Sequence, residues 1–538
     1  MTSRETMAKP PSRLRVNASA VAPRLAIFAV VVVLVTGLVV GMIDDYALAE
    51  VAPYFILAIA LQFLPFIVRP EPDPFEPSGL TSVHTVLALV PAFTSFLAQG
   101  GVSIILLPHV SGRAKVELLQ TVLIAYSLAT LCYFAGYYIR AGKKLARIFP
   151  NVAGGEWDKS RLILVSVVCF AFFIPAYAYF QARVGASITD ITALRAGKAV
   201  WRDDATMSWL MRGVGLGFIP ALLFVTLNFP RVRVGRAIGT AFLLFAIGFL
   251  STRLGQRGTA IFFVLNALIV VHYLGRRIPI AILAVCAFVL MTISNILGAY
   301  RANPDQFTAS SSGPAVSFDA TQTLVDHEDD RARLAAMAVV FHFFPERVDY
   351  ALGGSWGPLL TAPIPRWLWP EKGKLFVWRD TNIVLELVGA PIPVPFMGVL
   401  YANFGWVGIV VGMVLWGMFQ RGLYEWLLEH HKDRSVVVLY SFIVVYFTPT
   451  MLQLSGTIGF VLPLWVALRF MRKKGKPAKK GALPGPGPAG LLSMGPHVVP
   501  NPRALAARRP AIAATRPVAL LPAHRAEVDP EAGPAPAE

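Results

Sequence analysis

Residues 255–270 read GQRGTAIFFVLNALIV, a short polar turn followed directly by an apolar run. The same pattern recurs along most of the chain, with apolar runs of about 20 residues between polar loops, as transmembrane helices require. Hydrophobic residues make up 55% of the chain and charged residues only 15%, whereas a soluble domain is about 25% charged. The sequence therefore predicts an all-α, polytopic membrane protein.

The apolar runs predict about twelve transmembrane helices. They cover residues 25–43, 51–68, 80–98, 116–138, 162–181, 209–229, 237–252, 260–275, 278–296, 397–420, 435–450 and 456–470. The first run follows a basic segment and lacks a convincing small-residue cleavage site, so it predicts a helix and not a signal peptide. We expect a cytoplasmic segment at 1–24, a transmembrane domain at 25–470 and a tail at 471–538.

Basic loops predict which side each helix end faces, because Lys and Arg favour the cytoplasmic side. With the N-terminal segment in the cytoplasm, four basic stretches fall on the same side: RAGKKLAR at 140–147, PRVRVGR at 230–236, GRR at 275–277 and the start of the tail. The acidic loop RPEPDPFEPSG at 69–79 also falls there, which the rule tolerates since acids contribute little to it. The turn STRLGQRGTA at 251–260 and the hydrophilic insertion at 297–395 then lie outside.

The net charge of +18 does not indicate a nucleic-acid partner. Much of it lies in the tail, where residues 471–538 contain 11 Lys/Arg against 4 Asp/Glu. This tail is rich in Pro, Ala, Gly and Arg, so we expect it to be disordered and to have some affinity for anionic lipid headgroups. The three cysteines lie within apolar runs and predict neither a disulfide framework nor a metal site.

Arginines on the external side run against the orientation bias and need a reason. Arg253 and Arg257 are four residues apart, and they would share one face if the preceding helix continued through them. Gly255 and Gly258 would let a ligand approach the backbone closely. Planar guanidinium groups suit phosphate or diphosphate recognition. The alternative is that both side chains extend to lipid phosphates or pair with loop acids.

A second informative stretch is YALGGSWGPLLTAPIPRWLWPEKGKLFVWRD at 350–380, where tryptophans alternate with cations. Aromatic faces stack on sugars while cations hold phosphate, although a belt that anchors the loop at the interface would have the same composition. The candidate ligand residues here are Arg366, Trp367, Trp369, Lys372 and Arg379. The candidate general bases nearby are His342, Glu346 and Asp349, chosen by location.

Three segments together resemble the Wzy-type O-antigen and exopolysaccharide repeat-unit polymerases of bacteria. GQRGTAIFFVLNALIV is similar to that family's Arg-Gly signature leading into a helix, and the 350–380 stretch is similar to its Gly-Gly-Ser … Pro-Arg-x-x-Trp-Pro-x-Lys loop. GVLYANFGWVGIVVGMVLWG at 398–417, with Asn403, resembles its Tyr-x-Asn-Phe-Gly helix start. The segments occur in the family's order within residues 160–470.

This resemblance implies an inverting glycosyltransferase in the bacterial plasma (inner) membrane, with an architecture similar to GT-C enzymes and an active face toward the periplasm or exterior. It implies a donor and an acceptor that are oligosaccharide repeat units on undecaprenyl diphosphate, in contact with membrane lipids. No nucleotide sugar, other cofactor or metal is expected. A chain-length regulator and a flippase are further candidate partners.

The same chemistry gives the candidate residues their roles. Arg253 and Arg257, with Arg366 and Lys372 as second choices, would stabilise the charge that grows on the departing diphosphate. Trp367, Trp369, Arg379 and Asn403 would belong to the substrate loop. Two alternatives remain open: an O-antigen-type ligase that shares this donor, and a transporter or flippase of lipid-linked sugars.

Overall fold

The computed structural model describes the parts of the chain in which the helices are placed. These are residues 18–41, 43, 46–69, 73–98, 110–149, 152, 156–184, 216–227, 257–275, 277–279, 328–356, 394–447 and 454–473, with a few residues between 282 and 289 and residues 364, 368, 369 and 371. Contacts divide the chain into Met1–Lys474 and Gly475–Glu538. The second unit lies wholly outside the described residues, so the disordered tail stays a prediction.

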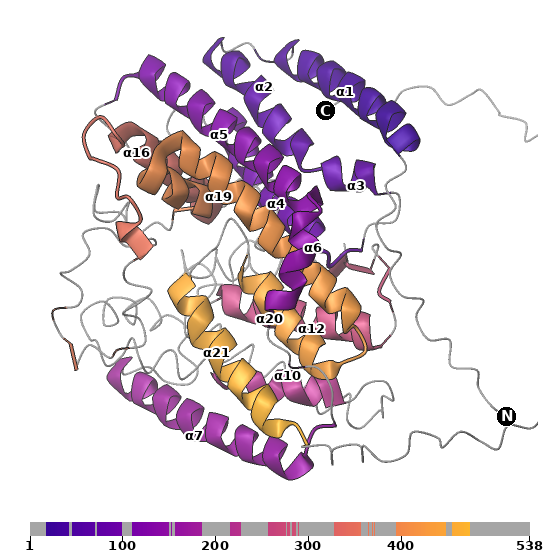
Figure 1. Ribbon diagram of the computed structural model, residues 1–538. Helices are drawn as coiled ribbons and strands as arrows, with labels where there is room; N and C mark the ends of the chain where they lie inside the picture. The colour runs from indigo at the N-terminus through magenta and orange to yellow at the C-terminus, as the bar shows by residue number, and fades with distance from the viewer. Residues whose placement is uncertain are drawn as a thin grey trace, which may run out of the picture. The chain divides into compact units, whose positions relative to one another are not determined.

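Every regular element in the described residues is helical (Figure 1). The α-helices are α1 (Ala18–Gly41), α2 (Tyr46–Leu61), α3 (Leu64–Val68), α4 (Pro77–Ala98), α5 (Gly112–Tyr138), α6 (Ala141–Leu145), α7 (Lys159–Val184), α10 (Phe218–Leu227), α12 (Arg257–Leu274), α16 (Glu328–Phe343), α19 (Phe396–Glu429), α20 (Arg434–Tyr446) and α21 (Leu454–Met471). Two short 3₁₀ helices, η2 (Ala146–Ile148) and η3 (Gly354–Trp356), complete the described elements.

Four of the described helices contain segments long and apolar enough to cross a membrane. These are Val21–Gly41, Gly112–Tyr138, Lys159–Tyr179 and Phe396–Glu429, and several shorter apolar helices accompany them. Apart from α6 and α16, the described α-helices overlap the predicted runs, whereas 237–252 and most of 278–296 lie outside the described residues. The all-helical membrane character is therefore supported, while the count of about twelve spans stays a prediction.

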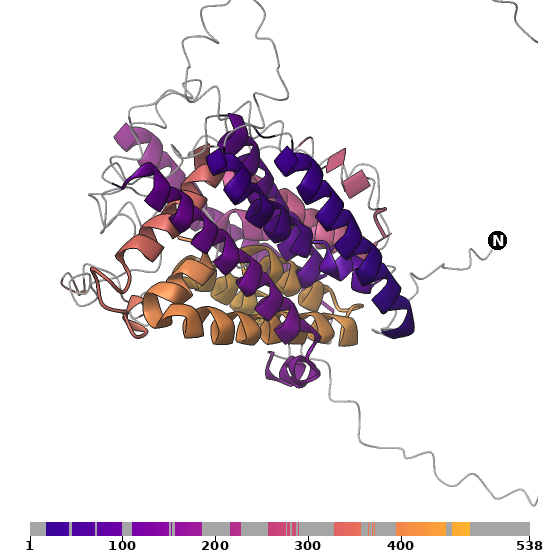
Figure 2. The ribbon, with the colours of Figure 1, turned by 90° about the horizontal axis from the view of Figure 1, so that it is seen from above.

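Two hydrophobic cores hold the described helices together, and α19 contributes to both. One core contains buried residues of α2, α4, α5, α16 and the first half of α19. The other contains buried residues of α7, α10, α12, α20, α21 and the second half of α19. Figure 1 shows the long orange α19 passing from the α5 and α16 group to the α20 group. By contrast, the membrane-length segment of α1 contributes to neither core and lies beside α2 (Figure 2).

Glycines allow α5 and α19 to pack backbone against backbone. A Cβ atom on Gly136 of α5 would overlap the carbonyl of Val414, and one on Gly417 of α19 would overlap the carbonyl of Tyr133. Such close approach is typical of membrane bundles, where van der Waals packing replaces the hydrophobic driving force between helices.

The predicted insertion contributes to the core, because α16 lies within it. Side chains from Leu334 to Val340 are almost completely buried, and α16 packs against α4, α5 and α19. This apolar stretch is too short to span a membrane alone, so the sequence pattern did not separate it from the surrounding hydrophilic residues.

Helix ends meet at two opposite levels. At one level, the Tyr137 end of α5 and the Tyr273 end of α12 contact the loop at 69–76. The start of α20 contacts Trp157, just before α7. The end of α21 joins the same level through an antiparallel bridge between Trp157 and Arg472. We call this level the Asp73 end.

The start of α19 and the turn after α16 meet at the other level, which we call the Asn403 end. The starts of α2 and α5 are joined elsewhere by an ion pair between Glu50 and Arg113, with 2.7 Å between the charged atoms. These contacts agree with the predicted alternation of helix ends. Which level faces the cytoplasm stays a prediction.

Candidate functional site

Asn403 joins two segments that the sequence analysis singled out separately. Its side chain is fully buried, with 0% exposed. The amide oxygen accepts a hydrogen bond from the Gly353 N–H at 2.8 Å, and the amide nitrogen donates to Ser355 Oγ at 2.7 Å. The same nitrogen donates to the Val399 carbonyl one turn earlier at 2.7 Å. Asn403 therefore fixes the Gly-Gly-Ser turn onto α19.

Backbone contacts reinforce this junction. The Ala351 N–H donates to the Ala402 carbonyl at 3.0 Å, and the Leu352 N–H donates to the Asn403 carbonyl at 3.1 Å. Those two α19 carbonyls are available because the helix is interrupted just beyond them, at Gly405. The N–H groups of the turn at 351–355 therefore bind carbonyl groups that would accept hydrogen bonds within the helix if α19 were continuous.

Gly405 has backbone angles that other residues rarely adopt, with φ of 62° and ψ of −148°. A Cβ atom there would also lie only 2.7 Å from the Tyr350 hydroxyl. Gly353, in the turn held by Asn403, has a φ of 89°. Glycine is needed at both positions because an L side chain is strained at positive φ. This explains why glycine occurs at these positions in the 350–380 and 398–417 segments.

Aromatic rings surround the junction at the Asn403 end. Tyr401 stacks on Phe341 with ring centroids 3.9 Å apart, and Trp406 lies edge-on to Tyr401 at 5.7 Å. Phe404 packs on Trp356 at 5.8 Å. Trp406 and Phe404 remain more than one-third exposed. Such partly exposed ring faces could stack on a sugar or a lipid.

The three candidate bases lie on or just after α16, but their environments differ. Glu346 and Asp349 are exposed, and His342 is half-buried in the last turn of α16. Burial lowers the pKa of the His342 imidazole below its usual value; the Arg347 cation lowers it further, and Glu346 acts in the opposite direction. The ring is therefore neutral at neutral pH and can accept a proton. His342, Glu346 and Asp349 therefore all stay candidates for the general base.

Most candidate cations lie outside the described residues, namely Arg253, Arg366, Lys372 and Arg379, as does Trp367. Trp369 is described and half-buried. Arg257 is the first residue of α12. Since an 18-residue helix is about 27 Å long, Arg257 lies a helix length away from Tyr273 and the Asp73 end. That position agrees with the level predicted to be external.

No protein-family model matches the chain. No curated protein and no solved structure shows significant similarity to it either. Within the described residues, no cluster of three or more His, Cys, Asp or Glu side chains could hold a metal ion. The interpretation of the Asn403 end therefore depends on its geometry and on the quoted resemblance.

A second polar cluster, at the Asp73 end, was not predicted from the sequence. We call it the Asp73 network; it comprises Arg69, Asp73, Glu76, Tyr137, His272, Tyr273, Tyr424 and Tyr440. Its acids come from the loop that the orientation rule placed in the cytoplasm despite its negative charge. In the structure both acids have partners within the protein.

Glu76 and Asp73 are satisfied in different ways. Glu76 is 1% exposed, forms an ion pair with Arg69, and accepts a hydrogen bond from the Tyr137 hydroxyl at 2.7 Å. Asp73 Oδ2 accepts hydrogen bonds from the hydroxyls of Tyr273 at 2.9 Å and Tyr424 at 3.1 Å. Buried charges are tolerated only with partners of this kind.

His272 and Tyr440 complete the network. The His272 Nε2 atom lies 3.6 Å from Asp73 Oδ1, and its Nδ1 atom accepts a hydrogen bond from the Ile278 N–H at 3.1 Å. The Tyr440 hydroxyl donates to the Phe75 carbonyl at 2.6 Å. A proline-rich loop containing an Arg and three acids was the available sequence signal, but the loop's hydrogen-bond partners elsewhere in the chain come from α5, α12, α19 and α20. Spacing alone could not identify them.

Proposed function

We propose that the protein polymerises oligosaccharide repeat units carried on polyprenyl diphosphate, by inverting glycosyl transfer at the external face of a bacterial plasma membrane. The observation that best supports this proposal is the junction at Asn403. Two segments quoted for their resemblance to repeat-unit polymerases are about 50 residues apart in sequence, yet Asn403 bonds directly to Gly353 and Ser355.

The proposed chemistry assigns a task to each charged group. Cleavage of the anomeric C–O bond leaves negative charge on the departing lipid diphosphate, and Arg257 would interact more strongly as that charge grows. Arg253, Arg366 and Lys372 are the further candidates for this role. One of the three candidate bases would accept the proton of the acceptor hydroxyl while the sugar carbon is attacked. The exposed rings of Phe404 and Trp406 would support the sugar or its lipid.

Substitution of Arg257 tests the proposal. In a host whose own gene is deleted, Arg257→Ala should abolish polymer and cause single lipid-linked repeat units to accumulate at the external face. Arg257→Lys should restore only part of the polymer, because a point charge does not reproduce the planar fork. Membrane insertion should be unchanged, as measured by protein level in membranes. Polymer of normal length in Arg257→Ala cells would contradict this assignment.

The accumulated intermediate also separates the alternatives. A ligase defect would leave finished polymer on the lipid carrier. A transporter or flippase defect would leave single repeat units at the cytoplasmic face.

A further inference from the structure

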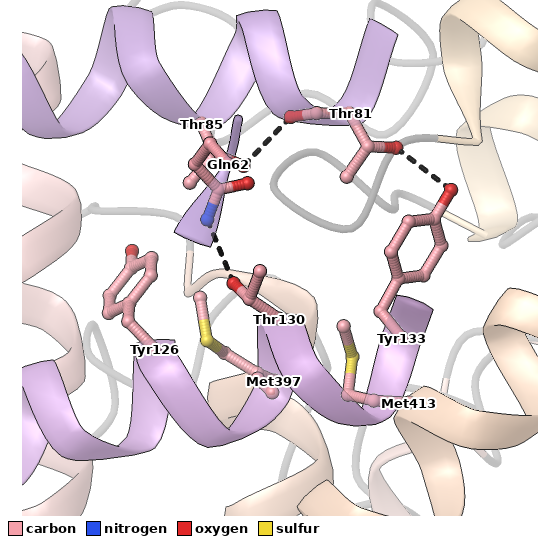
Figure 3. Close-up of a pocket in the computed structure, with 9 residues that line it drawn as sticks. Gln62, Thr81, Thr85, Tyr126, Thr130, Tyr133, Met397 and Met413 are labelled. Atoms are coloured by element: carbon pink, nitrogen blue, oxygen red, sulfur yellow. Dashed lines mark hydrogen bonds between the residues drawn. The ribbon is translucent and has the colours of Figure 1, made fainter. Parts of the chain in front are cut away.

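A small cavity lies between α4, α5 and α19, next to the end of α2. Its volume is about 20 Å³, and a cavity needs about 10–15 Å³ to hold one water molecule. Figure 3 shows residues of its lining: Gln62 directly after α2, Thr81 and Thr85 from α4, Tyr126, Thr130 and Tyr133 from α5, and two methionines of α19. The polar lining residues are all buried.

Two hydrogen-bonded pairs face each other across this space (Figure 3). On one side, Gln62 Nε2 donates to Thr130 Oγ1 at 2.9 Å. On the other, Thr81 Oγ1 donates to the Tyr133 hydroxyl at 3.3 Å. Thr85 takes no part in either pair, since its hydroxyl donates to the Thr81 carbonyl at 2.9 Å.

The hydroxyl protons of Thr130 and Tyr133 need acceptors. Each of these oxygens accepts a hydrogen bond and carries a proton of its own. Among the described residues, the structure gives neither proton a protein acceptor. A buried hydroxyl without an acceptor costs about 1–3 kcal/mol.

We propose that the cavity is a binding site for one water molecule. The water oxygen accepts hydrogen bonds from the Thr130 and Tyr133 hydroxyls, and one water proton is donated to Gln62 Oε1. Three hydrogen bonds are the usual number for a buried water. The site ties α2 to α5 deep in the bundle. It also continues the Asp73 network inward, because Tyr133 lies one helical turn from Tyr137.

A double-mutant cycle tests this site in the full-length chain. Thr130→Val and Tyr133→Phe each remove one hydroxyl and nearly preserve shape, and each should lower the thermal unfolding temperature. The two hydroxyls share no direct hydrogen bond, so they are coupled through the water. The double variant should therefore lose clearly less than the sum of the single losses. Additive losses would overturn the proposal.

The matched control pairs Thr130→Val with Ser127→Ala. Ser127 lies three residues from Thr130, as Tyr133 does, but its hydroxyl donates to the Leu123 carbonyl and does not line the cavity. This pair should be additive, and non-additive losses here would show that neighbouring substitutions on α5 are coupled without water.

Two further measurements distinguish a bound water molecule from an empty cavity and from a bound sodium ion. Ala129→Val fills the cavity with methyl groups, so a rise in unfolding temperature would show a dry cavity and overturn the proposal. Greater stability of the unsubstituted protein in sodium chloride than in choline chloride, lost in Thr130→Val, would indicate a sodium ion in place of water. Equal stability in the two salts supports water.

Discussion

At the scale of single residues, the polar side chains identified by sequence motif and those identified by structure carry different kinds of information. Asn403 stood out in the sequence because it lies two residues after a tyrosine and directly before Phe-Gly, at a predicted helix start. The structure shows that its side chain is committed to the turn at 353–355. In this conformation the Asn403 side chain holds the turn in place through hydrogen bonds. Its predicted place in a substrate loop therefore amounts to positioning that loop.

Removing the Asn403 amide should loosen the junction. Asn403→Ala leaves the Gly353 N–H and the Ser355 hydroxyl without their partner, at about 1–3 kcal/mol for each orphaned buried group. Ser355→Ala removes only one bond and should cost less. We expect the thermal unfolding temperature of the purified protein to be lowest for Asn403→Ala, intermediate for Ser355→Ala and highest for the unsubstituted protein. Equal temperatures for all three would show that the bonds do not hold the turn.

At the scale of elements, sequence periodicity predicted where helices occur better than where they end. The run at 397–420 predicted a helix, and α19 continues nine residues further, to Glu429. The extension contains Arg421, which is buried and forms an ion pair with Glu425 one turn later. In the sequence, the apolar run stops at a charged residue such as Arg421. The pairing of Arg421 with Glu425, which the sequence pattern does not show, lets the helix continue within the protein.

The junction between α5 and α19 was equally invisible to periodicity, yet it gives a sharp prediction. Gly417→Ala places a methyl group against the Tyr133 carbonyl, a backbone atom that cannot move independently of α5. We expect a fall in thermal unfolding temperature or a loss of monodisperse protein in detergent, since overpacking costs about 1–3 kcal/mol.

Gly37→Ala on α1 is the matched control, because nothing lies within 4 Å of a Cβ atom there. It should leave the unfolding temperature unchanged or raise it, since alanine favours helix more than glycine does. If the two substitutions behaved alike, the close contact between α5 and α19 would have to be abandoned.

At the scale of the whole molecule, the charge of the loops and the contacts of the helix ends give two independent views of sidedness. The basic-loop rule sorted helix ends by counting Lys and Arg, and it accepted the loop at 69–79 as an exception. In the structure, Glu76 of this loop forms an ion pair with Arg69, and Asp73 accepts hydrogen bonds from Tyr273 and Tyr424. Helix ends assigned to one side by charge then meet at one level. Neither the loop charges nor the helix-end contacts depend on where the bilayer lies.

Labelling of introduced cysteines in intact cells settles the remaining step. On a background with Cys132, Cys169 and Cys286 replaced by serine, Gln256→Cys should react with a membrane-impermeant maleimide from outside. Lys144→Cys, at an exposed position of α6 directly after α5, should react only after the cells are permeabilised. Diphosphate-linked donors at the external face can meet Arg257 only if the 251–260 turn is external. Reversed labelling would place that turn beside the cytoplasm and remove the physical basis for glycosyl transfer there, while leaving the helix packing and the buried water site intact.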